Sequence, residues 1–214
     1  MRVFIPLRNG QKDFEELRYA IRSMVKYFTS MTGLVIVGER VRWYTGDHIY
    51  ERDLINHIDF NMYRKLMHLK GETVLYTTDD HFALRPFDEN LPNYACNTCG
   101  ELAKTHPSGR HKKQYQNCEP DWWNYDIHVP MVMNTNNFEW TDEKPRPIKS
   151  YYGAQNNLIP SPLLDPKLGH RHTYEQILSY IDGKPFFSTG PWSMNFHMMQ
   201  VLKQLYPEKS IYER

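Results

Sequence analysis

The sequence predicts an α/β fold in which a mostly parallel, Rossmann-like sheet is flanked by helices. Two apolar runs, residues 2–7 and 33–38, have the length and composition of buried parallel strands. Between them, residues 14–28 repeat apolar side chains at the spacing of an amphipathic helix. Strand, helix and strand in this order predict a right-handed βαβ unit.

The elements that follow extend this unit. Asp13, with Glu16 three residues later, has the spacing of a capping box for the first helix. Residues 42–50 indicate a loop or an irregular strand, and residues 53–69 predict a second helix. A third strand follows from Val74. This β-α-β-α-β order places the carboxyl ends of the first and third strands on one edge of the sheet.

The third strand ends in two adjacent carboxylates, Asp79 and Asp80, at the edge where open α/β sheets bind ligands. Neighbouring carboxylates repel each other unless a metal ion or a basic side chain neutralises them, and a hard divalent ion shared with substrate phosphates is the usual solution. We therefore expect Mg²⁺ or Mn²⁺ here, with Arg8 and Lys12 converging on the same crevice. On a strand, His81 would point away from Asp80. The alternative is an ordinary strand-end turn, where Asp is common.

Bulk composition narrows the class of protein. The chain is 40% hydrophobic and 24% charged, which is typical of a globular protein rather than a disordered one. Its formal net charge of +1 gives no overall field toward nucleic acids or membrane surfaces. The apolar runs are too short to span a bilayer, and three cysteines do not favour a disulfide scaffold. We therefore expect a soluble, cytoplasmic protein without a membrane span.

Three stretches of the sequence resemble nucleotide-sugar glycosyltransferases of the GT-A fold. They are Phe-Ile-Pro-Leu-Arg-Asn at 4–9, Glu-Leu-Arg-Tyr-Ala-Ile-Arg-Ser at 16–23 and Tyr-Thr-Thr-Asp-Asp-His-Phe at 76–82. The resemblance is to the branch related to Stealth-type sugar-phosphate transferases and to small phage or bacterial glycosyltransferases. The GT-A metal motif is usually Asp-x-Asp; here Thr78 stands at its first position, where the Stealth-like branch has Asn.

The resemblance implies roles for individual residues. Asp80 would be the metal ligand, and Asp79 would act in catalysis through the ribose or the donor sugar. The nucleotide and its phosphates would be contacted by Arg8, Arg18, Asn61 and Lys65. For Arg18 and Lys65, a solvated helix face is the alternative.

A second candidate metal site lies in the polar segment 96–118. It holds a Cys-x-x-Cys pair, two histidines and a third cysteine, but few apolar residues with which to fold. A zinc ion would order the segment beside the acceptor entrance, and it would be structural because four protein ligands leave no open position. Those ligands would be Cys96, Cys99, Cys118 and one histidine, with His111 as the candidate. The alternative is three free thiols on an exposed, flexible loop.

The stretch 121–133 carries further polar side chains. Asp126 and His128 alternate with apolar residues, so on a strand both would share one face. Facing the crevice, they could supply a general base or a further metal ligand. The similar transferases carry a Tyr-Asp-x-His-x-Pro element that matches residues 125–130, which implies a functional His128. A structural histidine is the alternative.

The rest of the chain is predicted from local signals. Residues 141–166 are rich in Pro, Asn and Ser and indicate a long loop, which could act as a lid. Residues 173–181 predict a helix and residues 186–192 a short strand. Ser193 is expected to cap a final helix that ends at residue 205.

Pattern and resemblance together predict one GT-A-like domain. It comprises a nucleotide-binding half (1–90), a Cys/His insertion (91–120) and an acceptor-shaping half (121–214). The expected activity is a metal-dependent transfer of sugar from a nucleoside-diphosphate sugar to the hydroxyl of a saccharide or of a modified DNA base. His128 or Asp126 would take the acceptor proton if the reaction inverts configuration. The alternatives are Stealth-type transfer of a sugar 1-phosphate and a non-catalytic nucleic-acid-binding module built on the zinc segment.

Overall fold

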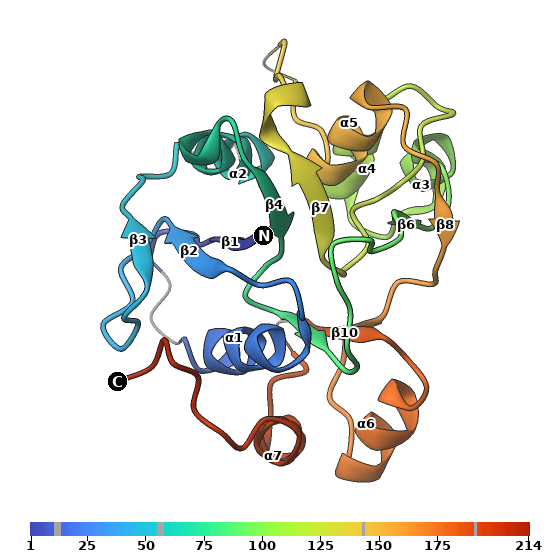
Figure 1. The fold of residues 1–214 in the computed structure, drawn as a ribbon. Coiled ribbons are helices and arrows are strands. Elements are labelled where there is room, and N and C mark those ends of the chain that lie inside the picture. The colour runs from blue at the N-terminus through green and yellow to red at the C-terminus, as the bar shows by residue number, and fades with distance from the viewer. Residues whose placement is uncertain (11–13, 55–57, 143, 191) are drawn as a thin grey trace.

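The computed structural model describes residues 1–10, 14–54, 58–142, 144–190 and 192–214. Within these ranges, the largest sheet has five strands in the order β3-β2-β1-β4-β7 (Figure 1). The strands are β1 (Arg2–Pro6), β2 (Gly33–Val37), β3 (Asp47–Ile49), β4 (Thr73–Tyr76) and β7 (Met131–Asn134). The first four are parallel, and β7 is antiparallel to β4. The predicted α/β class with a mostly parallel sheet is confirmed.

Helices cover both faces of this sheet (Figure 1). The helices of the described ranges are α1 (Glu15–Tyr27), α2 (Ile58–Leu66), α3 (Cys99–Thr105), α4 (Gly109–Tyr115), α5 (Ile148–Gln155), α6 (Tyr174–Ile181) and α7 (Phe196–Leu205), with 3-10 turns η1 (Met67–Leu69) and η2 (Thr135–Asn137). Because side chains alternate along β1, Val3 and Ile5 pack against α1 on one face. Phe4 packs on the other face, in a cluster that includes residues of α2 and α5.

The chain leaves β4 and enters a second sheet, ordered β5-β10-β9. This sheet consists of β5 (His81–Ala83), β10 (Phe186–Thr189) and β9 (Lys167–Leu168). Phe82 and Phe187 stack with their ring centroids 4.7 Å apart, in a cluster that also holds side chains of α6 and α7. The second sheet therefore brings residues from the end of the chain beside the acid pair. A two-stranded pair, β6 (Tyr94–Ala95) with β8 (Ser161–Pro162), completes the strands of the described residues.

Two segments that were expected to lack regular structure contain helices. The polar segment 96–118 forms α3 and α4, and Thr98 and Glu101 make a capping box at the start of α3. The expected long loop 141–166 contains α5 and β8. In α5 the side chains of Ile148, Tyr151 and Tyr152 are buried, at the i, i+3 and i+4 spacing of a helix.

Several boundaries differ from the predictions. Helix α6 is confirmed, with Thr173 as its cap, but α7 begins after Asn195, whose side chain accepts from the Met198 amide. Ser193 instead binds Gly190 in a turn, with its hydroxyl 2.8 Å from the Gly190 nitrogen. The predicted helix 53–69 is represented by α2 and η1, and residues 55–57 lie outside the described ranges, as do Lys12 and Asp13. None of the helices in the described ranges is both long and apolar enough to cross a membrane.

Candidate functional site

The acid pair lies in the turn after β4, at the sheet edge where β1 also ends. β1 and β4 are neighbours, with Phe4 opposite Tyr76, and the Thr77 amide donates to the Phe4 carbonyl at 3.0 Å. Asp79 and Asp80 are half-buried in this turn. The prediction that the acids directly follow a strand at a sheet edge is confirmed, although this strand is the fourth of the chain because residues 47–49 form β3. Asp80 directly precedes the second sheet.

The carboxylate of Asp80 is surrounded by polar groups from three segments. Its Oδ1 accepts from the Thr78 hydroxyl at 2.5 Å and lies 3.7 Å from Nε2 of His81. Its Oδ2 accepts from the Ser188 hydroxyl at 3.4 Å and lies 4.0 Å from the ammonium of Lys167. A basic side chain is therefore among the neighbours of this acid.

His81, Ser188 and Lys167 form one row across the second sheet. His81 lies opposite Ser188 in the strand register, and Ser188 lies opposite Lys167. Side chains directly opposite each other project from the same face of a sheet, so the row presents an imidazole, a hydroxyl and an ammonium to Asp80. The expectation that His81 points away from Asp80 is wrong, although the His81 side chain is buried.

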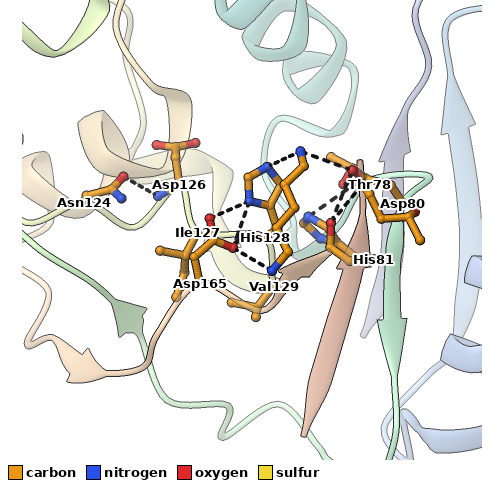
Figure 2. Close-up of polar contacts among 12 residues, drawn as sticks. Thr78, Asp80, His81, Asn124, Asp126, Ile127, His128, Val129 and Asp165 are labelled. Atoms are coloured by element: carbon orange, nitrogen blue, oxygen red, sulfur yellow. Dashed lines mark hydrogen bonds and ion pairs between the residues drawn. The ribbon is translucent and has the colours of Figure 1, made fainter. Parts of the chain in front are cut away.

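His128 completes the cluster from a different segment (Figure 2). It lies in a bend at 127–129 before β7, not on a strand as predicted. Its Nδ1 is 2.9 Å from Oδ2 of Asp165, and its Nε2 is 2.8 Å from the Lys167 ammonium. The rings of His81 and His128 meet edge to face, with centroids 6.2 Å apart. Asp165 and Lys167, two positions apart in one segment, thus contact both ring nitrogens of His128.

These contacts define which nitrogen of His128 carries the proton. The Lys167 ammonium can only donate, so Nε2 accepts and Nδ1 carries the hydrogen that Asp165 receives. Asp165 also accepts from the backbone amides of His128, at 3.3 Å, and Lys167, at 3.2 Å. Burial raises the pKa of Asp165, but the hydrogen bonds from His128 outweigh it and lower the pKa. Nε2 is therefore the basic atom that the ring offers to a proton or a metal ion.

A buried lysine supports the bend that carries His128. The Lys149 ammonium donates to the carbonyl of Ile127 at 2.5 Å and to that of Val129 at 3.0 Å. Burial lowers the pKa of Lys149, and the charge of Asp126 opposes this most among its neighbours. By binding both carbonyls, Lys149 fixes the backbone on both sides of the histidine.

His81 is a neutral member of the cluster. Burial lowers the pKa of His81 well below its usual value, and the positive charges of Lys149 and Lys167 lower it further. Its Nδ1 is 3.3 Å from the Thr77 hydroxyl. His81 therefore contributes a hydrogen-bonding ring beneath the acid pair and no positive charge near neutral pH.

Asp126 has a structural position. Its carboxylate accepts from the Ser150 amide and hydroxyl, both at 2.8 Å, and from the Lys149 amide at 3.2 Å, so it caps α5. Figure 2 shows Asp126 apart from His128, beside Asn124. The shared strand face that was predicted for Asp126 and His128 is wrong, and this placement does not favour Asp126 as the general base. The error arose because residues 127–129 form a bend and the strand begins only at Met131, so the side chains do not alternate as they would on a strand.

A cavity of about 360 Å³ opens at the carboxyl end of β1. Its polar and charged lining consists of Arg8, Asp53, Asn61, Lys65 and Arg110. The Arg8 and Arg110 side chains are exposed. Arg110 is brought there by α4, which is tied to α2 because the Gln114 amide donates to the Asp59 carboxylate. Two exposed guanidinium groups at a strand end suit an anionic ligand such as a diphosphate.

Asn61 and Lys65 line the same cavity but have internal partners. Asn61 exchanges hydrogen bonds with the Leu54 backbone at 2.8 and 2.9 Å. The buried Lys65 ammonium is 2.5 Å from Asp53 Oδ1 and donates to the Leu7 carbonyl. Asn61 therefore holds Leu54 to α2, and Lys65 joins Asp53 to the residue that follows β1. A direct contact of either with phosphates stays a prediction.

The structure does not bring Arg18 to this cavity. Its guanidinium lies over the Trp43 ring, 4.2 Å from the centroid, and pairs with Glu15 at 2.9 Å and with Glu213 at 3.3 Å. Glu213 also takes two hydrogen bonds from Arg22, so the C-terminal tail is fastened to α1. This position does not favour the nucleotide contact that was expected of Arg18. It also differs from the alternative of a solvated helix face, because the guanidinium has partners within the protein.

The cysteines are distributed over two parts of the core. Cys99 and Cys118 are buried with Tyr115, whereas Cys96 is half-buried and packs against the cluster around α1. A hydrogen bond to Cys99 and burial raise the pKa of the Cys118 thiol. His111 stacks on His106, with ring centroids 4.9 Å apart. No three His, Cys, Asp or Glu side chains of the described residues come together as a metal-binding group, and the zinc site stays a prediction.

The donor set at Asp80 and His128 fits a divalent ion that is shared with a ligand. One carboxylate and one imidazole nitrogen are too few to hold Mg²⁺ or Mn²⁺ alone, but substrate phosphates commonly supply the remaining oxygens. The Lys167 ammonium already stands between these two groups as a protein cation. A positive charge is thus accommodated at this position.

No sequence pattern pointed to Lys149, Asp165 or Lys167. Lys149 and Asp165 fall in the segment that was taken for a loop, although the spacing of Ile148, Tyr151 and Tyr152 could have revealed α5. Asp165 and Lys167 flank Pro166 and carried no recognisable signal. Lys167 reaches Asp80 through the pairing of β9 with β10, and Asp165 contacts His128.

Comparison of the chain with models of known protein families and with curated proteins found no match.

Proposed function

We propose that the chain is a metal-dependent glycosyltransferase of the GT-A type, which moves a sugar from a nucleoside-diphosphate sugar to an acceptor hydroxyl. The observation that carries this proposal is the position of Asp80 and His128 on either side of the Lys167 ammonium. This cluster lies at the sheet edge that also bears the cavity lined by Arg8 and Arg110. A nucleotide in the cavity would have its diphosphate between Arg8 and Arg110, near the acid pair. The resemblance of residues 76–82 to the metal strand of such enzymes supports the same assignment.

The residues of the site divide the work as follows. When bound, a divalent ion supplies positive charge to the leaving diphosphate. Asp80 and Nε2 of His128 would hold that ion, and Arg8 and Arg110 would bind the outer phosphate oxygens. Asp165 keeps the proton on Nδ1, so Nε2 would take a proton from an acceptor hydroxyl when it is not a metal ligand. Asp79 would contact the ribose or the donor sugar.

The decisive test is a screen followed by product analysis. Nucleotide sugars would be screened by thermal shift with Mn²⁺, because a ligand that binds only the folded state raises stability. The best donor would then be incubated with saccharides and with hydroxymethylated DNA. We expect release of a nucleoside diphosphate, at least roughly a hundredfold slower in Asp80→Asn. Asp121→Asn, at an exposed acid, is the matched control.

Other products would assign other functions. Release of a nucleoside monophosphate would favour the Stealth-type transfer of a sugar 1-phosphate. Salt-dependent binding of DNA without turnover would favour the nucleic-acid-binding module. Equal turnover by the wild-type protein and Asp80→Asn would refute the role of the acid pair.

A further inference from the structure

We infer that Lys167 is a built-in competitor of the divalent ion: its ammonium occupies the cation position between Asp80 and His128 and has to leave before the ion binds. This inference rests on the proposed metal-dependent function. It concerns a residue of β9 for which neither the sequence patterns nor the resemblance implies a role.

The first step is the position of the ammonium. Lys167 Nζ is 2.8 Å from His128 Nε2, the lone pair that a metal ion would need. It is also 4.0 Å from Asp80 Oδ2. Nitrogen and oxygen ligands of Mn²⁺ lie at only about 2 Å, so the ion and the ammonium cannot both lie between these two groups. Occupation by one excludes the other.

The second step is the rigidity of the backbone on which Lys167 lies. Its register opposite Ser188 and the hydrogen bond from its amide to Asp165 fix the backbone. The side chain is 30% exposed, so its flexible stem has open space into which the ammonium can move. Displacement therefore requires a rotation of the lysine side chain and no change in the strand.

The third step concerns where the ammonium goes. Leaving Asp80 and His128 costs Lys167 two favourable interactions, unless a new anion receives it. The diphosphate of a donor would bring that anion to the same crevice. Metal and donor should consequently bind more tightly together than separately, because the donor removes the competitor.

The test measures binding of Mn²⁺ alone by isothermal titration calorimetry, without turnover. Lys167→Met removes the competing charge at similar side-chain length and should tighten Mn²⁺ binding by roughly ten- to hundredfold, the usual weight of a charged hydrogen bond. Lys167→Arg retains a cation and should bind Mn²⁺ about as weakly as the wild type. Lys203→Met, at an exposed lysine of α7, controls for the change in net charge.

The outcomes separate the inference from the proposed function. Tighter binding in Lys167→Met that is lost again in the double variant with Asp80→Asn supports the competition. Unchanged or weaker binding in Lys167→Met, with clear Asp80-dependent binding in the wild type, overturns the inference and leaves the proposed function standing. Absence of Asp80-dependent Mn²⁺ binding in every variant, even with the donor found by the screen, overturns both.

Discussion

The carboxylate of Asp165 lies 2.9 Å from Nδ1 of His128 and determines which ring nitrogen is basic. Asp165→Asn keeps the size of the side chain but removes the charge, and its amide can donate to Nδ1 and reverse the tautomer. We expect kcat for sugar transfer to fall by roughly ten- to hundredfold, as for other groups that orient a functional histidine. Steady-state kinetics with the donor found by the screen measures this, and an unchanged kcat would contradict the role of Asp165.

Arg8 and Arg18 form a matched pair for the nucleotide site. Arg8 lines the cavity at the end of β1, whereas Arg18 stacks on Trp43 and pairs with Glu213. Arg8→Met should weaken nucleotide binding by roughly ten- to hundredfold through the loss of a charged hydrogen bond. Arg18→Met should leave that affinity unchanged and lower stability by about 1 kcal/mol. Calorimetric titration of the nucleotide and urea unfolding of both variants distinguish these effects. Weaker nucleotide binding in Arg18→Met, with unchanged binding in Arg8→Met, would place the nucleotide beside α1.

The tail contact of Glu213 predicts a defined loss of stability in acid. Burial opposes ionisation, but the hydrogen bonds from Arg22 prevail and lower the pKa of Glu213 from 4.5 to about 2. A lowered folded-state pKa stabilises the protein above the unfolded value and loses this effect as the pH falls toward 2. The difference corresponds to about 3 kcal/mol near neutral pH.

Glu213→Gln should therefore be destabilised relative to the wild type at pH 7, and the difference should shrink as the pH falls below about 4.5. Urea unfolding across this range measures it. Glu208→Gln, at an exposed residue of the same tail, is the control that should show no such convergence. A difference between Glu213→Gln and wild type that does not depend on pH would contradict the buried ion pair.

Thiol reactivity reports on the cysteine segment. Cys96 is half-buried, whereas Cys99 and Cys118 are buried together and the pKa of the Cys118 thiol is raised. In the native protein, an aromatic disulfide reagent should react first with Cys96, and with the other two only on unfolding. Mass spectrometry after labelling identifies the sites. Equal protection of all three thiols, lost on chelation and accompanied by zinc in metal analysis, would instead establish the predicted zinc site.

The parallel sheet could be predicted from the sequence because each of its main strands can be recognised from consecutive residues alone. Buried strands such as 33–38 are continuously apolar, and the acids of the turn after β4 stand next to the strand that places them. The position of His128 beside this turn was also anticipated, but from the resemblance and with the wrong local structure. In the bend at 127–129 its orientation comes from Lys149 and Asp165, not from strand alternation.

The partners of Asp80 could not be predicted in the same way. Ser188 and Lys167 reach it through strand pairs of three or fewer residues. The pair of β5 with β10 joins segments more than 100 residues apart in the chain, and the pair of β9 with β10 joins segments about 20 residues apart. Such short strands carry too few residues for a periodic signal. The helices of 96–118 were missed for a different reason: their stability comes from caps and from packing on Tyr115 and Trp122 rather than from a long apolar face.

The turn from β4 to β5 is anchored at its two ends to different sheets. The Thr77 amide is bonded to Phe4 of the parallel sheet, and the Asp80 carbonyl accepts from Thr189 of the small one at 3.2 Å. The geometry of this acid therefore depends on residues encoded more than a hundred positions later. A fragment that ends after β7 would therefore lack Ser188, Thr189 and Lys167, the partners that hold Asp80 from the small sheet.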